Sequence, residues 1–364
     1  MLFDEKFRRP DGIQRLVKEL WDISQETGPI RLMEICGTHT MAIAKAGLRS
    51  LLPPSIQLLS GPGCPVCVTP AGAIDEILRL SGLPDVILAS YWDLLRVPGS
   101  VRGDTLLRRR ALGAQVQTVY SPMEALEIAV QHPDQEVIFL GVGFETTAPG
   151  TAACILEAKE QGASNFSVLC LLKSTEPALR ALIHAPDFAV DGFLCPGHVA
   201  VITGSDAFAF LPREFGLPAV VSGFEPADLL FSIYRLAEML RQKAPALENE
   251  YTRLVCPEGN PAAQSAMERV FLPTDSLWRG LGTIPNSGLA LREAFSPWDA
   301  AKKFGFSPSP AVELAGCQCG EVIRGACRPE QCPLFGRVCT PADPVGPCMV
   351  SGEGACAAAY RYQT

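Results

Sequence analysis

Cysteines in short Gly- and Pro-rich segments are the residues of this chain best suited to chemistry. Of the fourteen cysteines, seven lie between residues 317 and 356 and three lie close to the N-terminus. Structural disulfides are uncommon in the cytosol, so clustered cysteines in a cytosolic chain indicate metal binding or redox chemistry. The remaining four are scattered singly, and we expect them to be ordinary buried residues: Cys154, Cys170, Cys195 and Cys256.

The segment 34–40, EICGTHT, places a cysteine between an apolar run and a helical pattern. The positive end of a helix favours the thiolate form of Cys36, which is the form that binds metals. His39, three residues further on, is suited to be a second ligand or to hold a proton near the sulfur. The alternative is a buried cysteine with a histidine that caps the turn, and the spacing alone leaves both interpretations open.

A Cys-x-x-Cys pair follows in the segment 60–70, SGPGCPVCVTP. Cys64 and Cys67 have the spacing of a dithiol that cycles to a disulfide. A structural zinc site needs a second pair of ligands, and the chain has no other Cys-x-x-Cys and only four histidines. The pattern therefore favours a redox pair over zinc.

Two more polar turns follow apolar runs in the middle of the chain. GVGFETTAPG supplies the carboxylate of Glu145 and the hydroxyls of Thr146 and Thr147, and CPGHV supplies His198. The glycine spacing matches neither of the phosphate-binding loops, so a nucleotide site is not indicated. Each segment alone is compatible with a plain turn, but together with the two cysteine motifs they indicate one polar site at strand ends.

The segment 317–356 combines seven thiols with many Gly and Pro residues and shows no regular hydrophobic period. We expect that such a tail cannot build an apolar core and that a metal centre organises it. Soft thiolate ligands at this density favour an iron–sulfur cluster or zinc. The CxxxCxxC spacing of radical-SAM proteins is absent from the sequence.

Alternating strands and helices must position these motifs, and this alternation predicts an α/β fold with parallel sheets. Predicted strands cover residues 31–35, 56–59, 86–89, 115–119, 136–140, 166–171, 192–194 and 219–221. Predicted helices cover residues 41–48, 71–80, 122–130, 151–161, 177–184 and 226–241.

The pattern divides the chain into consecutive units. Residues 29–132 and 133–225 each open with a strand, a Gly/Thr-rich turn and a helix, which predicts two similar α/β domains facing one another. Residues 1–28 form one predicted amphipathic helix, expected to pack with a third domain. That domain, 226–364, is expected to be mostly helical or irregular and to carry the cysteine-rich tail.

Composition limits the possible partners and location. A formal net charge of −8 argues against nucleic acid or an anionic membrane surface as the main partner. With 48% hydrophobic and 19% charged residues, the chain is not intrinsically disordered. Because no apolar run reaches the ~18–20 residues of a membrane span and residues 1–10 lack a signal-peptide apolar stretch, we expect a cytoplasmic protein.

Five segments, in this order along the chain, resemble the HypD family of NiFe-hydrogenase maturation proteins: CGTHT (36–40), GPGCPVCVTP (61–70), GFETTAP (143–149), PGH (196–198) and CMVSGEGAC (348–356). The resemblance covers essentially the whole chain. It implies two thioredoxin-like α/β domains and a third domain with a 4Fe-4S cluster. It also implies a scaffold, shared with the protein HypC, on which iron acquires CN and CO ligands to become the Fe(CN)2CO group of the hydrogenase.

The resemblance also implies roles for individual residues. Cys36 is then the thiolate that binds mononuclear iron, with His39 close by, and Cys64 and Cys67 are the redox pair. Glu145, Thr146, Thr147 and His198 belong to the cleft. The family spacing C-x12-C-x6-C-x16-C selects as cluster ligands Cys319, Cys332, Cys339 and Cys356, which leaves Cys317, Cys327 and Cys348 as extra thiols.

Partners follow from the same resemblance. They are HypC, HypE as cyanide donor with HypF upstream, and the hydrogenase large-subunit precursor, reached through HypC. Two other functional classes remain open from the sequence. One is a free-standing iron–sulfur thiol–disulfide oxidoreductase, and the other is a structural interaction protein whose tail binds zinc.

Overall fold

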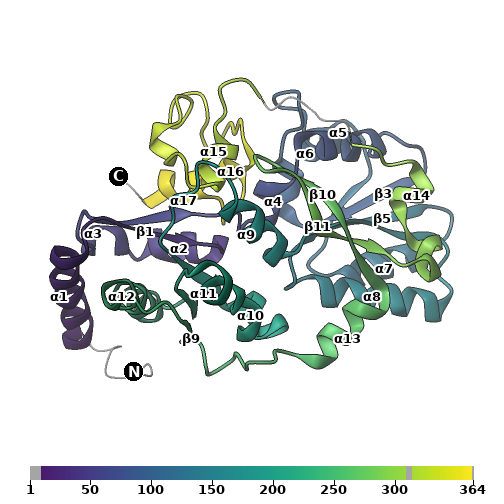
Figure 1. Ribbon diagram of the computed structural model, residues 1–364. Helices are drawn as coiled ribbons and strands as arrows, with labels where there is room; N and C mark the ends of the chain where they lie inside the picture. Colours follow the sequence, from purple (N-terminus) through teal and green to yellow (C-terminus); the bar gives the residue numbers. More distant parts are fainter. Residues whose placement is uncertain (1–9, 309–313, 363–364) are drawn as a thin grey trace.

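The computed structural model describes residues 10–308 and 314–362, and two parallel β-sheets flanked by helices form its centre (Figure 1). The first sheet has the strand order β2-β1-β7-β8-β9 and the second has the order β4-β3-β5-β6. The strands of the first are β1 (Ile30–Glu34), β2 (Ile56–Ser60), β7 (Gly192–Pro196), β8 (Ala219–Ser222) and β9 (Leu247–Asn249). Those of the second are β3 (Val86–Ser90), β4 (Val116–Thr118), β5 (Glu136–Gly143) and β6 (Phe166–Leu172).

All eight predicted strands form, which confirms the α/β class. The apolar run of β3, VILAS, is buried throughout, as is typical of a parallel sheet covered on both faces. Along β5 only Glu136 is partly exposed. That the two sheet units are thioredoxin-like stays a prediction.

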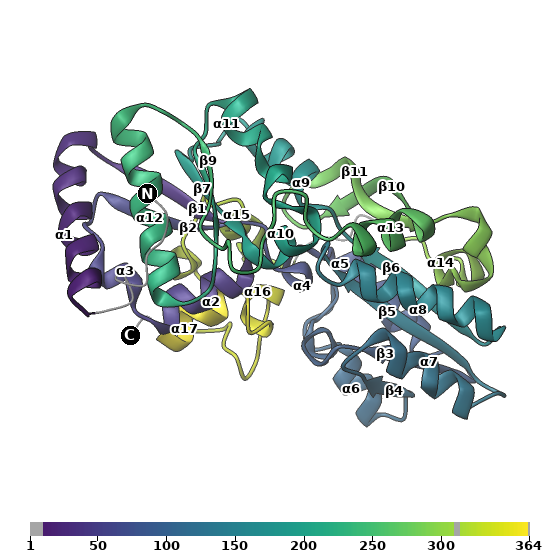
Figure 2. The ribbon, with the colours of Figure 1, turned by 90° about the horizontal axis from the view of Figure 1, so that it is seen from below.

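The predicted boundary at residues 132/133 is wrong, because it falls inside the second sheet, between β4 and β5. The chain makes β1 and β2, leaves to build the whole second sheet, and then returns to the first sheet with β7. Figure 2 shows the two resulting units next to one another. Strand–turn–helix patterns reveal each strand, but which parallel strands pair depends on long-range packing that the local pattern does not contain.

Helix α1 (Pro10–Thr27) packs against α12 (Pro226–Gln242) on the first sheet. Leu16, Leu20 and Ile23 of α1 belong to the same buried cluster as Leu229 of α12. The predicted helix therefore forms within the described residues, while residues 1–9 lie outside them. Its partner α12 lies within the predicted third domain but covers the first sheet, because its apolar face is buried there.

The other helices fill the connections between strands. Around the first sheet are α2 (Gly37–Lys45), α3 (Leu48–Leu51), α4 (Pro65–Val68), α10 (Gly197–Thr203), η3 (Ser205–Phe208) and α11 (Phe210–Phe215). The crossovers of the second sheet and the connections that flank it contain α5 (Ala71–Leu80), η2 (Trp92–Arg96), α6 (Leu106–Ala111), α7 (Pro122–Gln131), α8 (Ala148–Gln161) and α9 (Thr175–Ile183).

The region after α12 contains a β-hairpin that the sequence analysis missed. Helix α13 (Pro261–Val270) leads into the antiparallel strands β10 (Phe271–Trp278) and β11 (Gly282–Leu291), and η4 (Glu293–Trp298) and α14 (Ala300–Phe304) follow. The expectation of a mostly helical or irregular domain is therefore wrong for this part. Prolines at positions 273 and 285 and the irregular register weaken the alternating pattern that would have indicated strands.

The cysteine-rich tail folds into short helices that lie over the first sheet unit (Figures 1 and 2). They are α15 (Cys319–Ile323), η5 (Pro329–Gln331), α16 (Pro347–Val350) and α17 (Ala355–Tyr362). Helix α17 packs against α2, and α15 and α16 pack against α4. Contrary to expectation, the tail does bury apolar side chains, among them Val322, Ile323 and Met349, because it shares the core of the sheets instead of building its own.

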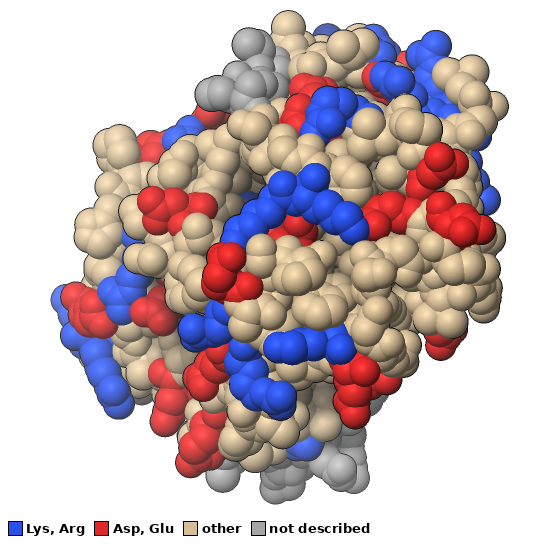
Figure 3. Space-filling model, turned by 90° about the vertical axis from the view of Figure 1, so that its right-hand side faces the viewer, with Lys and Arg blue, Asp and Glu red and all other residues tan. Residues whose placement is uncertain are grey.

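The surface carries charged side chains of both signs, as the composition indicates. Figure 3 shows acidic and basic side chains interspersed over one face of the molecule. In the described ranges, no helix combines the length and apolar character needed to cross a bilayer.

Candidate functional site

A cavity of about 260 Å³ lies where the carboxyl ends of β1, β5 and β7 meet. All four sequence motifs contribute to its lining, together with the hairpin and the tail. The lining includes Cys36, Thr38, Gly63, Pro65, Thr146, Thr147, His198, Trp278 and Glu353. Strand ends from both sheets therefore form one site, at the edge where parallel α/β sheets bind ligands. Contrary to expectation its lining is mostly apolar, since Ile35, Phe144 and Trp278 contribute to it beside the polar groups.

Cys36 lies two residues after the end of β1 and immediately before α2, with an extended backbone. The loop that precedes Cys64 packs against Cys36. The amide of Gly37 donates a hydrogen bond to the carbonyl oxygen of Gly63 at 3.1 Å. A Cβ on Gly63 would lie only 2.4 Å from the amide nitrogen of Cys36. Glycine at position 63 thus allows the two cysteine motifs to meet backbone to backbone.

The charge state of Cys36 differs from the sequence expectation. Burial raises the pKa of its thiol to about 11, although the backbone amides of His39 and Thr38 favour the thiolate. The nearby carboxylate of Glu353 raises this pKa further. Desolvation outweighs the helix N-terminus here, so Cys36 is a thiol until a cation offsets the charge.

His39 does not line the cavity. Its Nε2 lies 3.0 Å from the carbonyl oxygen of Gly223 and 3.3 Å from that of Ser222, which ties α2 to the turn after β8. Burial lowers the pKa of His39 to about 4, so the ring is neutral. Of the roles considered from the sequence, its contacts fit a structural anchor best.

His198 and the GFETT turn occupy different positions around the cavity. The ring of His198 stacks on Phe224 at 3.8 Å between centroids, on the exposed side, and burial lowers its pKa. Thr146 and Thr147 line the cavity. Glu145 instead accepts hydrogen bonds at 2.7 Å from the amide and the hydroxyl of Thr175, and so holds the start of α9.

Glu353 is a site residue that the sequence reasoning missed. Its Oε1 accepts a 2.6 Å hydrogen bond from the hydroxyl of Thr38, and burial raises the pKa of the carboxyl group. A Cβ on Gly37 would lie 2.8 Å from the carbonyl oxygen of Glu353, so glycine is needed for this approach. The signal was available: an acidic residue between two glycines in a segment rich in cysteine.

The dithiol is close to the cavity but not open to it. Cys64 and Cys67 are joined in a disulfide with a Cα–Cα distance of 5.2 Å. Cys64 is 5% exposed and Cys67 is 0% exposed. Pro65, between them, lines the cavity.

The tail gathers some of its cysteines and leaves others apart. The thiols of Cys319, Cys348 and Cys356 lie next to one another, and that of Cys317 lies next to Cys319. Cys339 lies near this group, and its Sγ accepts from the amide of Val345 at 3.3 Å. These thiols share a buried core with the dithiol.

Cys332 lies outside that group. It acts electrostatically on Cys327, and its Sγ is 3.9 Å from the carbonyl oxygen of Gly316. Three of the four predicted cluster ligands are thus together, and the fourth is not. Within residues 10–308 and 314–362, no group of three or more His, Cys, Asp or Glu side chains is already arranged to hold a metal ion.

Comparisons with known proteins agree with this assembly of motifs. The HypD family model, described as "Hydrogenase formation hypA family", matches residues 11–363. The chain belongs to the HypD family. The hydrogenase maturation factor HypD of Azotobacter vinelandii is 44% identical over 100% of this chain and 97% of that protein. The hydrogenase maturation factor HypD of Escherichia coli (strain K12) is 42% identical over 100% of this chain and 98% of its own length.

The similarity of this chain to a solved structure is much weaker than its similarity in sequence to the HypD proteins. The crystal structure of a 2,3-dimethylmalate lyase covers 70% of this chain and 85% of its own, at 11% identity and a TM-score of 0.16. That score is too low to support an argument.

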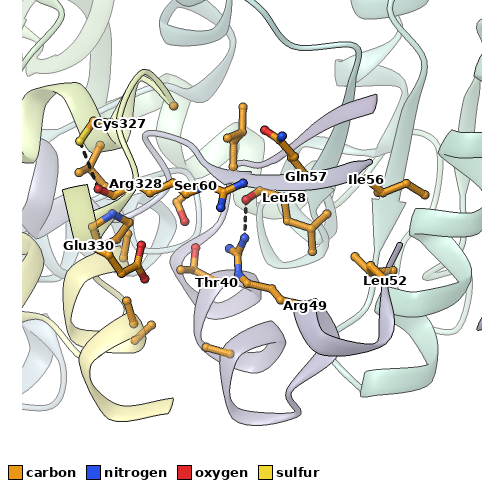
Figure 4. A pocket seen from close by; sticks show the side chains of 18 of the residues that line it. Thr40, Arg49, Leu52, Ile56, Gln57, Leu58, Ser60, Cys327, Arg328 and Glu330 are labelled. Atoms are coloured by element: carbon orange, nitrogen blue, oxygen red, sulfur yellow. Dashed lines mark hydrogen bonds between the residues drawn. The ribbon is translucent and has the colours of Figure 1, made fainter. Parts of the chain in front are cut away.

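A larger cavity of about 400 Å³ lies beside β2, between α3 and the tail, and contains none of the HypD site residues predicted above (Figure 4). Arg49 points into it and hydrogen-bonds to the carbonyl oxygen of Leu58. A second nitrogen of Arg49 lies 3.1 Å from Oε1 of the fully buried Glu34, which also accepts from Ser60 at 2.9 Å. This network holds the end of β1, two residues before Cys36.

Proposed function

We propose that this protein is a NiFe-hydrogenase maturation factor whose cleft holds iron while the iron acquires its CN and CO ligands. The relatives are named hydrogenase maturation factors. The observation that carries the proposal is the position of Cys36: one thiol in a cavity that all the family motifs line. The Fe(CN)2CO group is the cargo built there, not a resident cofactor.

The surroundings of Cys36 suit iron as cargo. Low-spin Fe(II) with strong-field ligands favours a soft thiolate. Because burial keeps Cys36 protonated, iron binding must release a proton. Glu353 is a carboxyl group of raised pKa beside the thiol and is placed to receive that proton. Thr38 holds Glu353 in position.

The proposed partners complete the cleft. HypC covers its open side, where His198 is exposed, and supplies a second cysteine ligand to the iron. HypE, with HypF upstream, delivers cyanide, and the hydrogenase large-subunit precursor receives the finished group through HypC. A cytoplasmic location follows from these partners.

The tail thiols have the chemistry of iron–sulfur ligands, although Cys332 would have to move toward Cys339 to join them. A 4Fe-4S cluster held by Cys319, Cys332, Cys339 and Cys356 would supply one-electron transfer. Cys64 and Cys67 form a two-electron couple. Helix α4 packs on α15 and α16, so the dithiol and the tail thiols lie in one buried core, suited to redox chemistry shielded from solvent.

The test compares Cys36→Ala with Cys256→Ala, a matched change at an exposed cysteine. Each variant is purified anaerobically with HypC, and infrared spectra are recorded for Fe–CN and Fe–CO bands. We expect Cys36→Ala to lose the bands and Cys256→Ala to keep them. Full bands in Cys36→Ala would show that the iron is bound elsewhere and would overturn the proposal.

The burial of the dithiol argues against a free-standing oxidoreductase. A diffusible protein disulfide cannot reach Cys67, which is 0% exposed, without opening of α4. Turnover of a disulfide substrate without HypC, unaffected by Cys36→Ala, would reverse this conclusion. A zinc-binding interaction protein would be colourless after anaerobic purification, whereas a cluster gives a brown sample.

A further inference from the structure

The tip of the β10–β11 hairpin carries a buried arginine that no motif contains. Arg279 is 4% exposed, although it lies in a turn. Its amide donates to the carbonyl oxygen of Val68 at 2.9 Å, and its Nε donates to that of Thr69 at 3.0 Å. Arg279 is therefore bound to the chain immediately after Cys67.

The same turn also contacts the tail. Gly280 has a positive φ of 74°, and a Cβ on it would lie 2.4 Å from Cα of Gly320, the residue after Cys319. On the other side of Arg279, the fully buried Trp278 lines the iron cavity. Three consecutive residues of the hairpin thus join the cavity, the dithiol helix and the tail.

The groups that act electrostatically on Arg279 include the thiols of Cys319, Cys348 and Cys317 and the carboxylate of Asp75. Asp75 also accepts a hydrogen bond from the amide of Ser100 at 2.8 Å. A buried guanidinium is costly unless negative charge offsets it, and thiolates add negative charge near Arg279 once they bind a metal.

We propose that Arg279 is a positioning residue that sets the reduction potential of the redox centre in the tail and fixes the dithiol helix against it. This inference rests on the proposed function, because it takes the tail to hold a 4Fe-4S cluster. A fixed positive charge stabilises the more negative, reduced state in a medium of low dielectric constant. The hydrogen bonds to Val68 and Thr69 keep the charge and the dithiol at a constant separation.

The experiment is a potentiometric titration with dithionite of anaerobically purified protein, with the reduced cluster followed by electron paramagnetic resonance. For Arg279→Gln we expect a more negative midpoint, by about a tenfold change in the one-electron equilibrium, or ~59 mV. Arg279→Lys keeps the charge and is expected to restore most of the shift.

The matched control is Arg324→Gln. Arg324 lies at the end of α15 and forms ion pairs with Glu321 and Asp187. The midpoint potential measured for Arg324→Gln should equal that of the wild type. An unchanged midpoint in Arg279→Gln, or an equal shift in Arg324→Gln, overturns the inference.

Two further outcomes are decisive. If Arg279→Gln does not fold, Arg279→Met replaces it, since an apolar side chain of similar volume leaves no unpaired amide. If neither neutral variant folds while Arg279→Lys does, the charge serves the fold and the inference fails. If wild-type protein carries no iron or acid-labile sulfide in the tail, the proposed function fails first, which distinguishes the two.

Discussion

The cleft around Cys36 and the cysteine-rich tail both contain half-buried or buried cysteines. The two regions differ in how much regular secondary structure holds those cysteines in place. In the cleft, one thiol is held by strand β1, by the backbone of Gly63 and by α2. In the tail, short helices of four to eight residues carry Cys319, Cys348 and Cys356, and the other four cysteines, Cys332 among them, lie in the loops between helices. Regular structure thus positions the cleft, whereas short helices and the loops between them position the tail thiols.

The two regions resemble one another in the charge state of most of their sulfur. Burial and the nearby carboxylate of Glu353 raise the pKa of Cys36. In the tail the pKa values of Cys317, Cys327, Cys339 and Cys356 are also raised, with burial among the causes in each case. Cys348 differs, because hydrogen bonds from Cys319 and Cys356 lower its pKa and Arg279 lies close by.

The largest effect should come from the tail ligand that lies apart. If Cys332 belongs to the cluster, Cys332→Ser should lose most of the iron and acid-labile sulfide bound by the tail, because a serine oxygen is a poor ligand for iron–sulfur clusters. The matched control is Cys327→Ser, a neighbouring half-buried thiol outside the ligand set. Iron and sulfide are assayed in anaerobically purified protein.

The same assay on Cys348→Ser distinguishes the two possible ligand sets. Cys348 contacts Cys319 and Cys356 directly, so it is the first substitute if Cys332 is not a ligand. We expect Cys348→Ser to keep its iron. Loss in Cys348→Ser together with retention in Cys332→Ser would show that the family spacing selects the wrong fourth cysteine.

In the cleft, the largest effect on stability should come from Arg49→Ala. This change leaves the fully buried carboxyl group of Glu34 without its ion pair, and we expect the free energy of unfolding to fall by about 3 kcal/mol. Lys302→Ala, which removes an exposed pair with Glu293, should cost much less, because solvent screens exposed ion pairs. Equal losses in urea denaturation would contradict a special role for this network.

A smaller effect is expected for Gly63→Ala, which places a methyl group against the backbone of Cys36. We expect a loss of about 2 kcal/mol and a displaced dithiol loop. Gly150→Ala is the control, because no atom lies within 4 Å of its added Cβ and it lies inside α8, so it should gain roughly 0.5–1 kcal/mol. If Gly63→Ala is as stable as Gly150→Ala, the contact between the two motifs is not tight.

The sequence predicts the strands well because each is a short apolar run between turn residues, as in VILAS of β3. It also predicts that the motifs at strand ends meet, since the carboxyl ends of parallel strands share an edge. It cannot predict that Glu145 turns away to Thr175 or that Glu353 enters the cavity. Those outcomes depend on side-chain direction and on packing between residues more than 300 positions apart, as in Thr38 and Glu353.

The last effect is a pH dependence of stability that comes from His39, which is buried beside the cleft. Burial lowers its pKa from the ordinary 6.5 to about 4, so between these values the unfolded chain binds a proton that the folded chain does not. Stability is therefore full above pH 6.5 and decreases as the pH falls toward 4, by at most about 1.4 kcal/mol per pH unit. Urea midpoints measured from pH 7.5 to 4.5 should show this slope.

His39→Gln keeps a side-chain donor for the carbonyl oxygen of Gly223 but has no proton to gain, so its slope between pH 6.5 and 4.5 should be shallower than that of the wild type. His132→Gln, at an exposed position after α7, should keep the wild-type slope. Part of the slope should persist in His39→Gln, because burial also lowers the pKa of His198. If His39→Gln shows the full wild-type slope, His39 is not the neutral anchor that its contacts indicate. Its ring would then be charged in the folded protein, and a role in holding a proton near Cys36 would again have to be considered.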